Sequence, residues 1–317
     1  MTETFRGRII KGVGGLYSVL EEGKKSAAEA LPCRARGVFR QKNLSPEVGD
    51  LVLFAEEERD GVKREGVICE ILERKNLLIR PPVANLDRLF VVLSVTTPVT
   101  VPLTADKLIA SAEHYMAEPV IVISKTSLDP SEAARMREIY ENAGFTVFVT
   151  DSRENSGIEL LREFITGSPV GLSAFAGASG AGKSTLINSL FPGMSLLTGD
   201  VSRKTGRGRH TTRAVELYPL SDLGYPDAEG FLADTPGFSA LDFLNFDFFE
   251  LPELPSNFRE FAPYLGECRY RKCTHLCEDG CAVCRAVEEG RISKSRHDSY
   301  RAIYAELKQR HPWEKKS

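Results

Sequence analysis

Residues 174–191 read AFAGASGAGKSTLINSLF, and this stretch decides the central fold. It has the G-x4-G-K-S spacing of a phosphate-binding loop (P-loop), with a strand-like apolar run before it and a helix-like run after it. Glycines let backbone N–H groups close around phosphate oxygens, and the helix N-terminus adds partial positive charge. A chance glycine-rich turn would not lie between a strand and a helix. We predict a nucleoside triphosphate site formed by Gly177, Ala178, Ser179, Gly180, Ala181, Gly182, Lys183, Ser184 and Thr185.

Side chains in and after this loop predict magnesium-dependent hydrolysis. Lys183 is expected to reach the β- and γ-phosphates, and the Ser184 hydroxyl is expected to bind Mg²⁺. Residues 234–237, DTPG, end another apolar run and have the D-x-x-G form of a GTPase switch. At this distance from the P-loop, we expect Asp234 to act on Mg²⁺ and the Gly237 N–H to meet the γ-phosphate.

Residues 206–213, GRGRHTTR, lie between these two motifs. Glycines and arginines without periodicity predict a loop that becomes ordered when triphosphate is present. Thr212, or its neighbour Thr211, is the expected Mg²⁺ ligand in that loop. The alternative interpretation is a solvated basic loop without a switch.

The residue that orients the attacking water is not evident from the D-x-x-G motif. Phe238 follows Gly237, where Ras-like enzymes carry a glutamine. His210 is the nearest candidate by sequence, because a neutral imidazole can orient water or accept a proton near pH 7. A histidine that is only a solvated loop residue remains the alternative.

The rest of the chain predicts a multidomain protein. Residues 1–85 alternate polar and apolar residues between Gly, Pro and Asp turns, which predicts a small β-barrel. Strand and helix patterns alternate over 86–243, which predicts a mostly parallel, doubly wound α/β sheet. Residues 244–317 hold a Phe- and Pro-rich segment, a cysteine cluster and a basic helical tail. Residues 80–87, RPPVANLD, are the expected linker after the barrel.

Charge and hydropathy exclude some classes of protein. The 317-residue chain has a net charge of −3, and its 42% hydrophobic and 27% charged residues are typical of a globular protein. We find neither a secretory signal nor an apolar run long enough for a membrane span, so we expect a cytoplasmic protein. We also expect it to be a monomer. Residues 285–317 carry 9 Lys and Arg against 5 Asp and Glu, a local net charge of +4.

GTPases also need a short motif that recognises the nucleotide base, and this motif is missing from its usual place after the D-x-x-G motif. The candidate lies before the P-loop instead, where Ser124, Lys125 and Ser127 follow the apolar run VIVIS. Residues 146–157, TVFVTDSRENSG, have the expected position of a second base-contacting loop. This rotated order predicts a circular permutation, which a domain tolerates when its natural termini are close in space.

Five of the seven cysteines lie between residues 268 and 284. In a reducing compartment such a cluster predicts a metal site rather than disulfides. Cys33 and Cys69 lie in apolar-alternating runs and are expected to be core thiols. Three thiolates and one imidazole form a closed tetrahedral set suited to one structural Zn²⁺, in the spacing Cys268-x4-Cys273-x-His275-x5-Cys281. Cys277 and Cys284 are extra, either as unligated thiols or as replacements for a named ligand.

This succession of a β-barrel, a base loop, GASGAGKSTLIN, GRGRHTTR, DTPGF and the zinc spacing resembles the circularly permuted, small-ribosomal-subunit-dependent GTPases of the RsgA type. The resemblance covers nearly the whole chain, and GRGRHTTR and the zinc spacing are its most specific parts. It implies an N-terminal OB-fold, GTP hydrolysis stimulated by the small ribosomal subunit, contact with its rRNA and a role late in its maturation. The residues it implies are His210, Lys183 and Thr212 for catalysis, Ser124, Lys125 and Ser127 for the base, and Ser184, Thr212 and Asp234 for Mg²⁺.

One departure from the family pattern concerns the base. Ser124 and Ser127 replace the asparagine and aspartate of N-K-x-D. A serine cannot make the bidentate, charge-assisted contact that an aspartate makes with guanine, and its loss removes on the order of 1–3 kcal/mol of discrimination. Asp129 is more economically explained as the cap of the helix that begins at Pro130. Relaxed base specificity is therefore a second hypothesis.

Three functions compete at this point. The leading one is a ribosome-activated GTPase whose barrel binds RNA through a basic stretch, Arg34, Arg36, Arg40 and Lys42. The second is an RNA-binding assembly factor that holds nucleotide with relaxed base specificity and hydrolyses it very little. The third, an ATPase or small-molecule kinase, would need a substrate pocket with its own acid or base, and the motifs contain none. The basic tail is expected to add phosphate contacts.

Overall fold

The structure is a computed structural model that describes residues 3–37, 39, 44–59, 63–79, 82–97, 99–167, 171–191, 193–194, 215–234 and 249–309. Its contacts divide the chain into two compact units. The first unit comprises Met1–Arg88, Glu159–Phe175 and Ser184–Gly237, and the second comprises Leu89–Ile158, Ala176–Lys183 and Phe238–Ser317.

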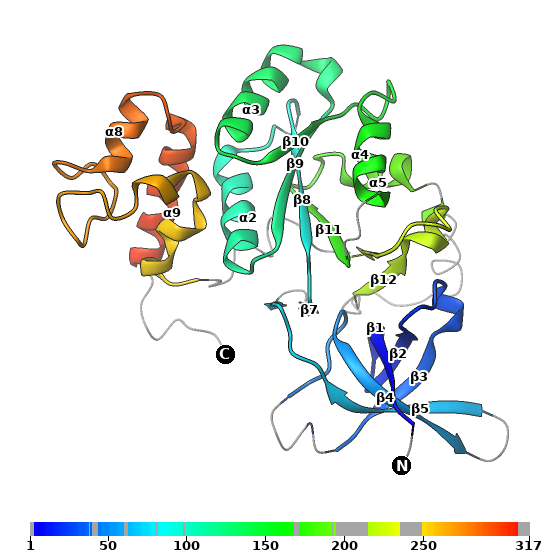
Figure 1. Cartoon of the computed structure of the whole chain (residues 1–317). Coiled ribbons are helices and arrows are strands. Elements are labelled where there is room, and N and C mark those ends of the chain that lie inside the picture. The colour runs from blue at the N-terminus through cyan, green and yellow to red at the C-terminus, as the bar shows by residue number, and fades with distance from the viewer. Residues whose placement is uncertain are drawn as a thin grey trace. The chain divides into compact units, whose positions relative to one another are not determined.

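The first unit begins with a closed five-stranded barrel (Figure 1). Its strands are β1 (Phe5–Val13), β2 (Leu16–Glu21), β3 (Leu31–Ala35), β4 (Leu51–Arg59) and β5 (Lys63–Ile71). They pair in the order β1-β2-β3-β5-β4, and β4 returns to β1 with Phe5 opposite Phe54. Alternate side chains fill the barrel, among them Ile9, Val19 and Ile68, which are fully buried. The closed order confirms the expected OB-fold.

The first unit also contains η1 (Ala27–Glu29), a hairpin described below, and the elements whose strands extend the sheet from β1. The latter are α4 (Ile158–Thr166, from its second residue), β11 (Leu172–Gly177, up to Phe175), α5 (Lys183–Leu190, from Ser184), β12 (Glu216–Pro219), η3 (Leu220–Leu223) and β13 (Phe231–Asp234). β11 and β13 are parallel, whereas β12 runs antiparallel to both β13 and β1. Where β1 pairs with β12, Lys11 and Glu216 form an ion pair.

The second unit contains the other strands of the nucleotide domain and the C-terminal helices (Figure 1). Its elements are β8 (Arg88–Ser94, from Leu89), α2 (Pro102–His114), β9 (Glu118–Ser124), η2 (Thr126–Leu128), α3 (Pro130–Asn142), β10 (Thr146–Val149), η4 (Leu251–Asn257), η5 (Arg259–Tyr264), α8 (Ala282–Glu288) and α9 (Lys294–Gln309). Strand order is β10-β9-β8, and β9 and β10 are parallel. Five consecutive residues of β8, Leu89–Leu93, are at most 1% exposed, as expected of a strand covered on both faces. The α/β expectation is confirmed.

The predicted linker is part of the folded structure. A hairpin of β6 (Leu77–Ile79) and β7 (Pro82–Ala84) occupies much of it. The side chain of Asn76 exchanges two hydrogen bonds with the backbone of Leu86, which is fully buried. Prolines and a polar composition suggested a linker, but the apolar residues between them are buried. In the described part of the chain, no helix is both long enough and apolar enough to cross a membrane.

Of the two cysteines that were expected to be core thiols, one is buried as expected. Cys33 is fully buried in the barrel, and burial raises the pKa of its thiol to about 12. The expectation of a core thiol is therefore confirmed for Cys33. Cys69 is only half-buried, and its thiol donates to the Val67 carbonyl.

A buried charge cluster joins α9 to α2 and η5. Arg296, which is 1% exposed, donates through Nη1 to Asp106 Oδ1 at 2.6 Å and through Nε to Glu260 Oε1 at 2.7 Å. Its guanidinium carbon also lies 4.7 Å from the centre of the Phe258 ring. A buried ion that loses its partner keeps its desolvation cost without compensation. We infer that Arg296 fixes the position of α9 within the second unit.

Replacing Arg296 tests this role. Arg296→Met leaves the carboxylates of Asp106 and Glu260 buried without their cation, and we expect it to lower the free energy of opening α9 by about 3–5 kcal/mol. Hydrogen exchange of the α9 amides measures this value. Lys294→Met is the matched control, because the Lys294 side chain is 83% exposed and its ion pair with Asp298 is worth less than about 1 kcal/mol. Equal protection in the two variants would contradict the inference.

Candidate nucleotide and metal sites

The P-loop follows β11 in the backbone conformation that its glycines permit. Gly177 has φ of 151° and Gly182 has φ of 93°, both in the region that favours glycine. A Cβ at Gly177 would lie 2.4 Å from the carbonyl oxygen of Val92 in β8, so only glycine fits there. This close approach between the loop and β8 is the reason for the first glycine of the motif.

Lys183 closes the P-loop on itself. Its Nζ donates to the carbonyl oxygens of Gly177 at 2.7 Å and Ala178 at 2.9 Å. Burial lowers the pKa of the Lys183 ammonium. The cation therefore lies inside the loop, as expected of a residue that binds phosphate oxygens.

The loop after β9 braces the P-loop through Ser124. The Ser124 side chain is buried, and its Oγ lies 2.7 Å from the carbonyl oxygen of Ala181 and 2.9 Å from that of Leu93. A hydroxyl has one proton, so it donates to one of these oxygens at a time. Ser124 thereby connects β8, β9 and the P-loop, and its predicted contact with the base stays a prediction.

Lys125 lies beside the P-loop as well. Its backbone has φ of 60°, a left-handed conformation that is uncommon for a residue other than glycine. Its Nζ donates to the carbonyl oxygens of Gly180 at 2.9 Å and Thr97 at 3.0 Å. The structure thus brings together the P-loop and the predicted base loop, which are more than 50 residues apart in the sequence.

Ser127 is paired with a carboxylate that the sequence analysis did not identify. The Asp151 Oδ2 accepts from the Ser127 hydroxyl at 2.6 Å and from the Ser127 N–H at 3.1 Å. Its Oδ1 accepts from the N–H groups of Arg153 and Glu154. Burial by itself would raise the pKa of Asp151, but these hydrogen bonds outweigh it and lower the pKa. Asp151 lies in the segment expected to form a second base loop, and only the fold shows that it supports the first.

Asp129 is a helix cap, as expected. Its Oδ1 accepts from the Glu132 N–H at 3.0 Å and from the Ser131 hydroxyl at 2.8 Å, and Pro130 is the first residue of α3. Its carboxylate is therefore committed to α3 and does not replace the aspartate of N-K-x-D.

The switch residues lie largely outside the described part of the chain. Asp234 is the last residue of β13. This strand pairs in parallel with β11, the strand that leads into the P-loop. Ser184 is the second residue of α5, and its side chain is exposed. His210, Thr212 and Gly237 lie outside the described residues and stay predictions.

The four predicted zinc ligands come together in the second unit. Their ligand atoms, from Cys268, Cys273, His275 and Cys281, all lie within 4.8 Å of one another. His275 Nδ1 is 3.6 Å from Cys268 Sγ and 3.7 Å from Cys281 Sγ. Tetrahedral Zn²⁺ with ordinary bond lengths separates such atoms by about 3.6 Å. The residues present therefore fit a zinc ion.

The surroundings of this set also suit thiolates. The Ala282 N–H donates to Cys268 Sγ, and the Cys284 N–H donates to Cys281 Sγ. Burial lowers the pKa of His275, which favours the neutral imidazole that binds metal. Bound Zn²⁺ would cross-link the loop to the start of α8 and supply a local core where side chains are mostly polar.

The Asp151 contact yields a paired test. Asp151→Ala removes the acceptors that hold Ser127 and the second loop, and hydrogen bonds to a charged group are worth about 1.5–3 kcal/mol. We expect GDP to bind at least about tenfold more weakly, as measured by titration with a fluorescent GDP analogue. Asp129→Ala is the control, since it removes a cap of α3 worth about 1 kcal/mol of stability and leaves GDP affinity unchanged. Equal losses of affinity would show that the Asp151 contact has no particular role.

Comparison with known proteins identifies the family of this chain. The model of the RsgA GTPase family matches residues 71–244, and the model of the RsgA N-terminal domain matches residues 6–68. Proteins named small ribosomal subunit biogenesis GTPase RsgA are similar along nearly their whole length. The one from Geobacillus kaustophilus is 42% identical over 96% of this chain and 98% of its own, and the one from Enterococcus faecalis is 41% identical over 98% of both chains.

Solved structures show the same fold. YjeQ from Thermotoga maritima is 32% identical, with a TM-score of 0.77 over 98% of this chain and all of its own. YloQ, described as a circularly permuted GTPase, is 34% identical, with a TM-score of 0.76 over 98% of this chain and 97% of its own. The rotated order of the base loop and the P-loop, their contact in the structure and these full-length similarities lead to one conclusion: the chain belongs to the RsgA family of circularly permuted GTPases.

Proposed function

We propose that this GTPase acts in the late maturation of the small ribosomal subunit and hydrolyses GTP in response to the subunit. The observation that carries the proposal is the contact of Ser124 and Lys125 with the P-loop in the permuted order of the family. It is supported by relatives named for small-subunit biogenesis that match from end to end.

The nucleotide would be held by residues 177–185 of the P-loop and by the loop after β9. Lys183 is placed to exchange its bonds with loop carbonyls for phosphate oxygens. Ser184, Thr212 and Asp234 would hold Mg²⁺, which neutralises charge that develops on the β- and γ-phosphates during transfer. His210 would orient the attacking water, because Phe238 cannot.

We assign the recognition of guanine to Ser127 with support from Asp151. Because the Ser127 hydroxyl donates its proton to Asp151 at 2.6 Å, only its lone pairs remain for a ligand. Donation to a carboxylate also makes that oxygen a stronger acceptor. A ring N–H of guanine supplies the matching donor, whereas adenine carries no proton at the corresponding ring nitrogen. The negative charge missing from position 127 is thus provided from the neighbouring loop.

Contact with rRNA is proposed for the barrel. A hollow of about 490 Å³ lies beside the β1–β2 turn, and Tyr17, Arg36 and Phe39 are among its lining residues. Phe39 is buried, so the half-buried Tyr17 ring and the exposed Arg36 cation are the groups that suit an unpaired base and a phosphate. Arg36 is exposed, and Arg34 is exposed apart from an ion pair with Glu65. Arg40 and Lys42 lie outside the described residues.

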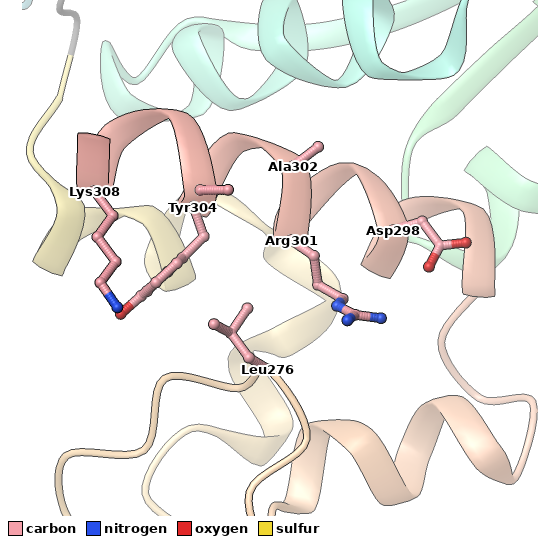
Figure 2. A pocket seen from close by; sticks show the side chains of 7 residues that line it. Leu276, Asp298, Arg301, Ala302, Tyr304 and Lys308 are labelled. Atoms are coloured by element: carbon pink, nitrogen blue, oxygen red, sulfur yellow. The ribbon is translucent and has the colours of Figure 1, made fainter. Parts of the chain in front are cut away.

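A second RNA contact is proposed for α9. Figure 2 shows the side chains of Arg301, Tyr304 and Lys308 extending from one side of α9 toward the loop that carries Leu276. They line a hollow of about 470 Å³. Two cations beside an aromatic ring suit a phosphate backbone. We further propose that the protein works as a cytoplasmic monomer.

The rate of phosphate release from GTP tests the proposed function. With GTP and purified small subunits, we expect release at least about tenfold faster than without subunits, because a partner can complete a catalytic site. His210→Ala is expected to lose on the order of 10²–10⁴-fold of the stimulated rate. His311→Ala, a histidine outside every motif, should behave as wild type. GTP binding without stimulation by subunits would overturn the proposal and favour an assembly factor that hydrolyses nucleotide very little.

A further inference from the structure

A second set of ligand-type side chains lies in the C-terminal part of the second unit. Cys277, Cys284 and His297 each offer one ligand atom, and these atoms lie within 4.8 Å of one another. None of the three belongs to the four-ligand set described above. They come from three separate segments: the loop before α8, α8 itself and α9. Their proximity is therefore a result of the fold and not of spacing along the chain.

The geometry of this set is close to that of a metal site. Cys284 Sγ and His297 Nε2 are 4.0 Å apart, a few tenths of an ångström more than about 3.6 Å, the separation of sulfur and nitrogen ligands on tetrahedral zinc. Cys284 and His297 are both buried, whereas Cys277 is exposed. An ion bound here would have three protein ligands and one side toward solvent.

The backbone at Cys277 is a second, independent observation. Its φ is 97°, and that of His275 two residues earlier is 59°. Positive φ at residues other than glycine costs on the order of 1–3 kcal/mol and persists where the surroundings or a function require it. This turn puts His275 in one ligand set and Cys277 in the other. We attribute the conformation to the need to serve both.

His297 has a competing role that the structure also shows. Its Nε2 lies 2.8 Å from the His275 carbonyl oxygen, to which it donates in the absence of metal. Ligation would require that proton to move to Nδ1 and the ring to shift toward Cys284. A purely supporting role would explain His297 and the Cys284 thiol, which donates to the same carbonyl oxygen at 3.7 Å. It would not explain the Cys277 thiol, which lies within reach of both.

We propose that Cys277, Cys284 and His297 form a second zinc site in addition to the four-ligand site. Two thiolates and a neutral imidazole balance the charge of Zn²⁺, which suits a half-buried position, and this ligand set is one that borderline-soft zinc favours. Binding releases the two thiol protons to solvent. The fourth coordination position is open, so the second ion exchanges faster than the ion in the closed set.

Native mass spectrometry of the full chain tests the second site. The protein is reduced, stripped with a chelator and reloaded with Zn²⁺ alone. We expect two zinc ions in wild type and one in the Cys277→Ser/Cys284→Ser double variant. Cys69→Ser, a thiol of the barrel, is the control and should keep two. On rechelation the faster phase of zinc release should be present in wild type and absent in the double variant.

His297→Gln distinguishes a His297 that binds zinc from one that only donates a hydrogen bond to the His275 carbonyl. Glutamine places an N–H donor where His297 Nε2 donates to the His275 carbonyl, but it is a poor zinc ligand. We expect this variant to keep its fold by circular dichroism and to bind one zinc ion. One ion in wild type would overturn the second site, and so would two ions in the double variant.

Discussion

The nucleotide site depends on one short contact, the 2.7 Å approach of the Ser124 hydroxyl to the Ala181 carbonyl oxygen. It joins the loop that we propose reads the base to the loop that we propose holds the phosphates. The Lys125 ammonium reinforces it at Gly180, and Gly177 lets the P-loop approach Val92 in β8. A circular permutation changes which loop comes first in the chain, but it leaves this contact possible because the strands keep their places.

The C-terminal region is held in a different way from the sheet. Buried aromatic residues, with Phe258, Phe261 and Tyr300 fully buried, form a small core, and Arg296 connects α9 to α2 through a buried charge cluster. The loop in front of α8 has little apolar surface of its own. Thiolates and an imidazole fit a zinc ion there, and a bound ion would take the place of hydrophobic burial. In the second site that we propose, Cys277, Cys284 and His297 would bind zinc in the same way at a more exposed position.

The sequence predicted most of the fold and the main parts of the site, since the motifs that carry chemistry also have fixed structural contexts. The P-loop requires a strand before it and a helix after it, and the four zinc ligands have a spacing that few other sites share. The sequence did not predict the partnership of Ser127 with Asp151, because the two residues meet through parallel pairing of β9 and β10. It likewise missed the Arg296 cluster and the burial of residues 83–86, which depend on tertiary packing rather than on periodicity.

The central claim is that guanine recognition persists although serines replace the asparagine and aspartate of N-K-x-D. Isothermal titration of the wild-type protein with GDP and with ADP, at equal Mg²⁺, tests it most directly. The account predicts that GDP binds at least about tenfold more tightly, because Ser127 can accept from guanine and finds no ring N–H on adenine. Equal affinities for GDP and ADP would contradict the assignment of Ser127 and Asp151 and would establish relaxed base specificity.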